Sequence, residues 1–115
     1  MKITLTNNFA PNTPKSFTEQ DSLLLGRSSI CDLTCNLLDV SRQHGRIEVA
    51  NEKVLFSDIG SLNGSHINNK HVPRGEVVEL KHGDRIRMGE YWEVEVHIER
   101  PELALTLAGE ESCNG

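Results

Sequence analysis

Hydrophobic and polar residues alternate with a period of two through most of the chain. The clearest run is at residues 92–98, where Trp, Val and Ile alternate with Glu and His. Shorter runs of the same kind occur at residues 3–6, 46–49 and 85–88. Successive side chains of a strand point to opposite faces of its sheet. Each run therefore predicts a β-strand with one face in a core and the other in water.

Turn signals separate these runs at short intervals. They are Asn51-Glu52, Gly60, Asn63-Gly64, Asn68-Asn69, the Pro-Arg-Gly triplet at 73–75, the His-Gly-Asp triplet at 82–84 and Gly89. Short strands with such turns between them predict an all-β sandwich or barrel. We expect one domain over residues 1–99. Residues 100–115 are expected to be a tail or linker, with a short helix at 102–108 and disorder after it.

The remaining polar and aromatic residues are assigned by their phase along the strands. Trp92 and Phe56 are in phase with apolar neighbours and are expected in the core. Surface positions are expected for His66, His71, His82 and His97. Glu93, Glu95 and Glu99 share the polar face of the last strand. They predict a solvated acidic face that also discourages pairing at a sheet edge.

The overall charge excludes some classes of partner. Lys and Arg number 12 against 17 Asp and Glu, a net charge of −5, which argues against a general nucleic-acid binder. The apolar runs are too short to cross a bilayer, and the N-terminus lacks the apolar core of a signal peptide. We therefore expect no membrane contact and a cytoplasmic location. Cys31, Cys35 and Cys113 are then expected to be reduced thiols.

Three polar clusters in predicted loops bring together the groups that bind phosphate. They lie at residues 26–29 (Gly-Arg-Ser-Ser), 41–44 (Ser-Arg-Gln-His) and 58–65, which contains Ser-Leu-Asn-Gly. Arginine can hold a phosphate through two parallel hydrogen bonds, and glycine allows close approach of the backbone to a ligand. The donors are Arg27, Arg42, Ser28, Ser41, Ser61 and Asn63. This set predicts a pocket for a dianion such as a phosphoryl group.

The order G-R-S, S-R-x-H and S-x-N-G, followed by a Gly-Asp turn and a hydrophobic strand, resembles the forkhead-associated (FHA) domain over residues 2–99. The resemblance implies an FHA-like β-sandwich of about eleven strands in two sheets, with binding loops at one end. It implies a module for Ser/Thr phosphorylation signalling that binds a phosphothreonine-containing protein or peptide, with no enzymatic activity and no cofactor. It also suggests a place in a larger signalling or secretion-type assembly.

The family's roles transfer to individual residues of this chain. Arg27, Ser41 and Arg42 match the phosphate contacts, and Asn63 matches the contact to the peptide backbone. Ser28, Ser61 and Leu62 complete the expected peptide-binding set. Gly26, His44 and Gly64 match residues that support the binding loops. Leu62 departs from the family, because many members have Thr there, and Cys31 stands where Asn is common.

Other interpretations of the same residues remain open. A scaffold or oligomerisation module could use the same sandwich without phosphate. Ser41 and His44 could be a nucleophile and a base, but no orienting acid or oxyanion hole is indicated. Cys31, Cys35 and His44 lack the second ligand pair of a zinc site, so no metal is expected. Asp58 and Asp84 are expected to cap turns, and Asp39 suggests a preference for a basic peptide residue.

Overall fold

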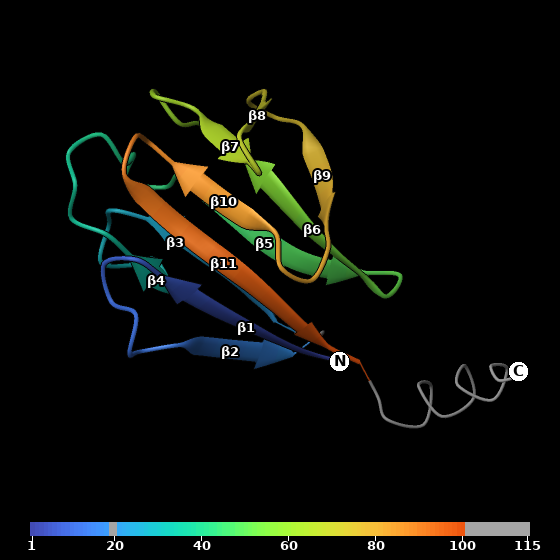
Figure 1. Cartoon of the computed structure of the whole chain (residues 1–115). Coiled ribbons are helices and arrows are strands. Elements are labelled where there is room, and N and C mark those ends of the chain that lie inside the picture. The colour runs from blue at the N-terminus through green and yellow to red at the C-terminus, as the bar shows by residue number, and fades with distance from the viewer. Residues whose placement is uncertain (19–20, 101–115) are drawn as a thin grey trace, which may run out of the picture.

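The computed structural model describes residues 1–18 and 21–100, which form eleven strands in two sheets (Figure 1). One sheet has the order β2 (Lys15–Thr18), β1 (Lys2–Asn7), β11 (Trp92–Glu99), β10 (Arg85–Met88), β7 (Ser65–Ile67) and β8 (Lys70–Val72). The other has the order β4 (Leu33–Thr34), β3 (Ser22–Gly26), β5 (Gly45–Ala50), β6 (Lys53–Asp58) and β9 (Val77–Leu80). Neighbouring strands are antiparallel except β3 and β4. The expected all-β sandwich is confirmed.

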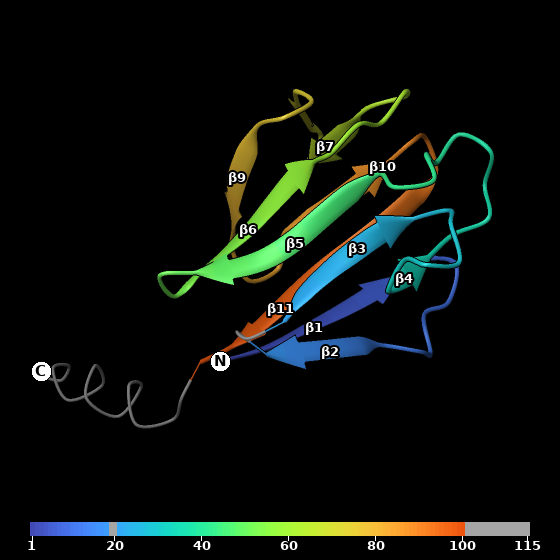
Figure 2. The same cartoon turned by 180° about the vertical axis from the view of Figure 1, so that it is seen from behind.

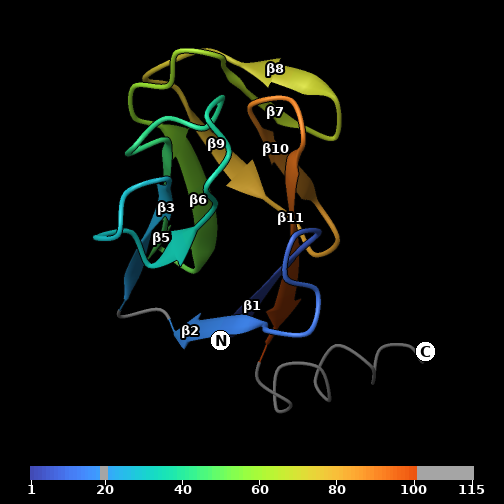
Figure 3. The ribbon, with the colours of Figure 1, turned by 90° about the vertical axis from the view of Figure 1, so that its left-hand side faces the viewer.

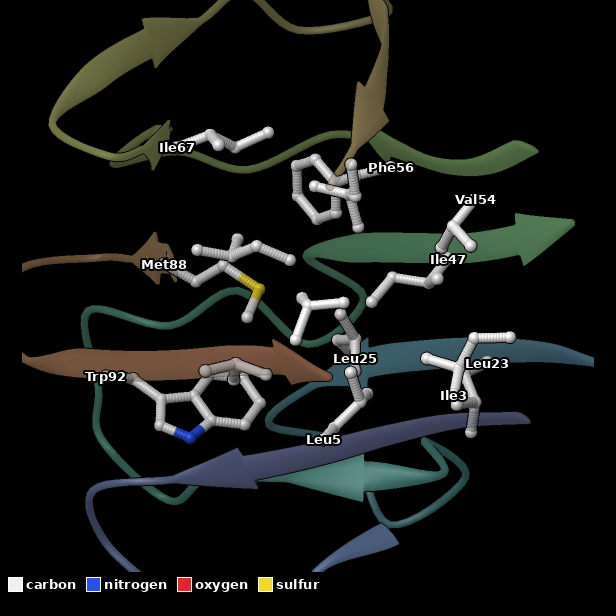
Figure 4. Close-up of a cluster of buried hydrophobic side chains, with 14 of the residues drawn as sticks. Ile3, Leu5, Leu23, Leu25, Ile47, Val54, Phe56, Ile67, Met88 and Trp92 are labelled. Atoms are coloured by element: carbon white, nitrogen blue, oxygen red, sulfur yellow. The ribbon is translucent and has the colours of Figure 1, made fainter. Parts of the chain in front are cut away.

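The two sheets face each other, and the core fills the space between them (Figures 2 and 4). Phe56 of β6 and Trp92 of β11 are fully buried, as their phase along the strands predicts. In β11 the buried and half-buried positions alternate from Trp92 to His97 with the expected period of two. Burying each large apolar side chain stabilises the fold by about 1.5–3 kcal/mol. The alternation therefore provides the core that holds the loops in place.

The prediction that the acidic face of the last strand guards a sheet edge is wrong. β11 lies in the middle of its sheet, between β1 and β10. Glu93 and Glu95 are half-buried, and their partners on β10 are Arg87 and Arg85. Pairing of the first strand with the last depends on contacts between distant parts of the chain. A local alternation of residues does not encode it.

His66 is less exposed than the sequence predicts. It lies on β7 directly opposite His71 of β8, and the two rings meet edge to face with their centroids 5.3 Å apart. Its Nδ1 is enclosed and has no hydrogen-bond partner among the described residues. Burial, with Arg87 and His71 nearby, lowers the pKa of His66.

Two hairpins confirm the predicted turn chemistry. Asn68 and Asn69 join β7 to β8, and both have positive φ. Asn51 and Glu52 join β5 to β6 in the same way. Two-residue hairpins favour such turns because their twist matches that of the flanking strands, and asparagine tolerates positive φ well.

The two ends of the sandwich differ in what they carry. Lys2 pairs with Glu99 at one end, and Asn7 pairs with Val94 at the other. The loops at residues 27–32, 35–44 and 59–64 gather at this second end, which faces the viewer in Figure 3. Within the described ranges, no helix is long and apolar enough to span a membrane. The expected helix at 102–108 lies outside the described residues.

Candidate functional site

The loops after β3 and before β5 are held side by side through their backbones. The N–H of Arg27 donates to the carbonyl of Ser41 at 3.0 Å, and the N–H of Ser28 donates to the carbonyl of Arg42 at 3.1 Å. A Cβ on Gly26 would collide with the Arg42 carbonyl oxygen. The glycine is therefore required for this close approach of the two backbones. The two loops that carry Arg27 and Arg42 lie side by side as a result.

Arg27 is oriented by one hydrogen bond from its side chain. Its Nε donates to the carbonyl of Val40 at 3.0 Å. Among the described residues no carboxylate forms an ion pair with Arg27 or with Arg42, which is exposed. The terminal nitrogens of Arg27 thus remain available on a guanidinium that is already positioned. Such preorganisation reduces the entropy lost when a phosphate binds.

His44 connects the loop that carries Ser41 to the loop that carries Asn63. It is fully buried, and its Nδ1 accepts the backbone N–H of Ser41 at 3.1 Å. Its Nε2 lies 3.0 Å from the carbonyl oxygen of Gly64. An N–H can only donate and a carbonyl can only accept, so the ring is the neutral tautomer with its proton on Nε2.

Burial lowers the pKa of His44, although the Gly64 carbonyl, Asp58 and Asp39 oppose this shift. A proton on Nδ1 would place an N–H against the N–H of Ser41. The buried environment and the hydrogen bonding therefore favour the same uncharged form. This arrangement agrees with the supporting role expected for His44.

Ser41 and Asn63, two of the predicted contacts, lie on neighbouring loops, and a hydrogen bond holds each side chain. Ser41 Oγ accepts the backbone N–H of Leu62 at 3.0 Å. A hydroxyl has one proton to donate, and that proton remains for a ligand. Asn63 Nδ2 donates to the carbonyl of Asp39 at 3.0 Å, which fixes the direction of its amide.

Asp58, expected to cap a turn, organises the whole loop at 59–64. Its buried carboxylate accepts the backbone N–H groups of Gly60 and Ser61 and the hydroxyls of Ser61 and Ser65. Burial alone would raise the pKa of Asp58. Hydrogen bonds from Ser61, Ser65 and Gly60 outweigh this effect and lower it. The carboxylate is therefore a charged anchor within the fold.

Ser61 occupies a different place from the one that its motif suggests. Its side chain is buried, donates to Asp58, and accepts the N–H of Gly64 at 3.1 Å. Its hydroxyl proton is thus used within the loop. Gly64 has a φ of +87°, in the region that favours glycine. Ser61 and Gly64 both shape the loop that carries Asn63.

The remaining predicted contacts lie at the rim of the site. The hydroxyl oxygen of Ser28 accepts the N–H of Ile30 at 3.3 Å, and Ser28 is half-exposed. Leu62 is 84% exposed and makes its anchoring contact through its backbone alone. The structure therefore brings all seven predicted peptide contacts to one end of the sandwich. Arg42, Leu62 and Asn63 are exposed, Arg27, Ser28 and Ser41 are half-buried, and Ser61 is buried.

Cys31 and Cys35 are buried free thiols. Burial is the main reason that the pKa of each thiol is raised, which keeps both protonated. Cys31 donates to the carbonyl of Arg42 at 3.1 Å, so it braces the loop that carries Arg42. Within the described part of the chain, no group of three His, Cys, Asp or Glu side chains is placed to hold a metal ion.

The sequence interpretation missed the role of Arg74. Its guanidinium donates to the carbonyl of Ser61 at 3.0 Å from the turn between β8 and β9. The neighbouring N–H of Gly75 donates to the Asp58 carbonyl at 2.8 Å. This turn therefore supports the loop at 59–64 through two hydrogen bonds. No spacing in the sequence indicates these contacts, because turn and loop meet only in the folded sandwich.

The geometry agrees with the result of a comparison with known families. The FHA-domain family model matches residues 23–89, a range that includes every residue predicted above to contact the peptide or to support the binding loops. The chain belongs to the FHA-domain family. A solved FHA domain, described in a study of phosphothreonine-dependent FHA domain interactions, superposes with a TM-score of 0.77 at 27% identity. That match covers 88% of this chain and all of the other.

Two curated relatives are similar to part of this chain. The proliferation marker protein Ki-67 of Mus musculus is 38% identical over 65 residues, which is 56% of this chain and 2% of that protein. The oxoglutarate dehydrogenase inhibitor of Corynebacterium jeikeium is 30% identical over 82 residues, which is 70% of this chain and 55% of the inhibitor. The chain thus spans only part of each relative.

Proposed function

We propose that this FHA domain is a phosphothreonine-dependent protein-binding module of Ser/Thr phosphorylation signalling. The observation that carries the proposal is the meeting of three donors on loops joined by His44: the guanidinium of Arg27, the hydroxyl of Ser41 and the amide of Asn63. Membership of the FHA family and the similarity to a domain studied for phosphothreonine-dependent interactions support it.

The phosphate, which carries nearly two negative charges at pH 7, is held by Arg27, Ser41 and Arg42. Charge-assisted hydrogen bonds of this kind are about twice as strong as neutral ones. Asn63 has its carbonyl oxygen and its second N–H free for the backbone of the peptide. Ser28 and Leu62 contact the peptide at the rim, whereas Ser61 supports the loop from inside.

The proposal assigns no chemical step to the chain. His44 Nδ1 accepts the backbone N–H of Ser41 rather than the serine hydroxyl, and Nε2 is occupied by Gly64. The imidazole therefore has no free nitrogen with which to activate Ser41 as a nucleophile. We place the module in the cytoplasm, bound to a phosphorylated protein, within a larger signalling or secretion-type assembly.

Arg27→Ala tests the proposal directly. Binding is measured by fluorescence anisotropy with one peptide in three forms: threonine, phosphothreonine and phosphoserine. We expect the phosphothreonine form to bind tightest to the wild-type chain. Arg27→Ala should weaken its binding about 10- to 100-fold, because hydrogen bonds to charged groups contribute about 1.5–3 kcal/mol.

Arg46→Ala is the matched control, because Arg46 is exposed on β5 and belongs to no binding loop. It should leave the affinity for the phosphothreonine peptide unchanged. Equal affinity for the threonine and phosphothreonine peptides would reject the proposal. Full partner binding by Arg27→Ala would favour the phosphate-independent scaffold.

A further inference from the structure

The loop at 59–64 also borders a groove, here called the back groove, that neither Arg27 nor Ser41 lines. This back groove has a volume of about 400 Å³ and is lined by Asp58, Leu62, Asn63, Gly64, His71 and Arg74, among others. Asn63 borders it, and the same residue bonds to the Asp39 carbonyl next to the phosphate-binding loops. A peptide that binds at Ser41 and Asn63 therefore reaches the mouth of the back groove.

Arg74 is linked to Ser41 through a single peptide group. The carbonyl of Ser61 accepts a hydrogen bond from Arg74 at 3.0 Å, and the N–H of the same peptide unit, on Leu62, donates to Ser41 Oγ at 3.0 Å. One face of the loop thus presents the Ser41 hydroxyl, and the other presents the Arg74 guanidinium. In a series of connected hydrogen bonds such as this one, each bond polarises the next.

The charge of Arg74 is not neutralised within the described residues. Their ion pairs are Lys81 with Glu79 and His97 with Glu95, and Arg74 takes part in neither. Asp58 is the carboxylate in the back groove, but it is buried and already accepts four hydrogen bonds from the loop. Arg74 is exposed and uses one donor on Ser61, so its other N–H groups can bind a ligand.

His71 supplies a second donor on the wall of the back groove. It is exposed, and its Nε2 lies 3.7 Å from the position that a Cβ on Gly64 would occupy. The ring therefore lies against the backbone that follows Asn63. Leu62, which is mostly exposed, forms an apolar wall of the same groove. Two nitrogen donors beside an apolar wall suit an anionic side chain with a short aliphatic stem.

We propose, on the basis of the function proposed above, that the back groove binds a second anionic group of the same phosphopeptide. Arg74 forms charge-assisted hydrogen bonds with this anionic group. His71 and Leu62 contact the rest of the side chain that carries it. The anion is a carboxylate of Asp or Glu, or a second phosphate. The preferred partner is therefore an acidic or doubly phosphorylated segment around the phosphothreonine.

The test compares phosphothreonine peptides that carry Gln, Glu or a second phosphothreonine at each flanking position in turn. We expect the wild-type chain to bind an acidic form about two- to fivefold tighter than the Gln form at one or more positions. Arg74→Gln keeps an amide that can reach Ser61 and removes the charge. The ratio of affinities for acidic and Gln peptides should then fall to about one.

Arg87→Gln is the matched control. Arg87 lines a different groove with Asp39 and Glu90, which neither Arg74 nor His71 lines. Its removal should therefore leave the ratio unchanged. The inference is overturned if no position favours an acidic residue, if the preference survives in Arg74→Gln, or if Arg74→Gln weakens all peptides equally.

The Gln peptide separates the inference from the proposal on which it rests. Phosphothreonine-dependent binding of the Gln peptide without an acidic preference rejects the back groove alone. Loss of phosphothreonine dependence in the Gln peptide rejects the proposed function itself. A preference for the second phosphate but not for Glu supports the inference and identifies the anion as phosphate.

Discussion

The exposed residues of the binding end and the buried residues beneath them make different kinds of contact. Arg42 and Asn63 are exposed, and Arg42 forms no ion pair in the part of the chain that the structure describes. His44 and Asp58 beneath them are buried, and their polar atoms are occupied by backbone and hydroxyl partners. On the function proposed above, we expect affinity for a phosphopeptide to depend on the exposed layer, and stability and loop shape to depend on the buried layer.

Asp58→Ala should have the largest effect. It leaves the hydroxyls of Ser61 and Ser65 and two backbone N–H groups without their acceptor. We expect the free energy of unfolding to fall by about 3 kcal/mol, since each unsatisfied buried donor costs about 1–3 kcal/mol before relaxation. Urea denaturation measures the loss. Asp84→Ala removes a half-buried turn cap and should cost about 1 kcal/mol. Equal losses in the two variants would contradict the special role of Asp58.

His44→Leu tests the connection between the two binding loops. It keeps an apolar side chain of similar size but removes the contacts to Ser41 and Gly64. We expect the chain to remain folded with a loss of about 2 kcal/mol. Affinity for the phosphothreonine peptide should also fall, because Ser41 and Asn63 are no longer held together. Unchanged affinity in the folded variant would show that the loops do not need this connection.

Arg42→Ala should change affinity without changing stability. Its side chain is exposed, so the free energy of unfolding should stay within about 0.5 kcal/mol of wild type. Affinity for the phosphothreonine peptide should fall about fivefold, and the loss should shrink as salt is raised. Paired anisotropy and denaturation measurements check both outcomes. A large loss of stability would place Arg42 in the buried layer.

Lowering the pH should have the smallest effect of the four, a decrease in the free energy of unfolding. The pKa of His44 is lowered in the folded chain, so the unfolded chain takes up its proton first as pH falls below about 6.5. The contribution of His44 is therefore complete above that pH and is lost below it. One such group costs at most about 0.7 kcal/mol between pH 7 and pH 6.

The pKa of His66 is also lowered, so His66 adds to the pH dependence of the wild-type chain. Comparison with His44→Leu isolates the part that is due to His44. Denaturation of both chains at pH 7 and pH 6 should show a smaller pH dependence in the variant. Asp58 acts in the same direction at lower pH. Its pKa is also lowered, so its contribution is lost only as pH falls below about 3.9.

The sequence predicts the parts of this structure that depend on neighbouring residues. Alternation at residues 92–98 predicts a strand with Trp92 inside, and the Asn68-Asn69 pair predicts a tight turn. Both follow from local geometry: the period of two in a strand, and the tolerance of asparagine for positive φ. The order of the motifs from which a phosphate site is predicted also predicts the family, and the match of the FHA-domain family model over residues 23–89 confirms it.

Contacts between distant segments are what the sequence does not reveal. Ser61 carries the same hydroxyl as Ser41, yet Asp58 draws it inward. Arg74 has no motif around it, and its role depends on the meeting of the β8–β9 turn with the loop at 59–64. The central place of β11 likewise depends on the pairing of β1 with the far end of the chain. These three features are fixed by packing between distant segments rather than by the local preferences of neighbouring residues.

The pairing of Lys2 with Glu99 has a practical consequence for how this domain can be attached. The polypeptide enters and leaves the sandwich side by side, at the end opposite the loops at 27–32, 35–44 and 59–64. Anything joined at either point therefore lies at the end opposite these loops, whether it is a fusion partner, a solid support or a neighbouring domain. The loops proposed to bind the phosphopeptide then remain open to solution, and the domain can be placed within a longer polypeptide without covering them.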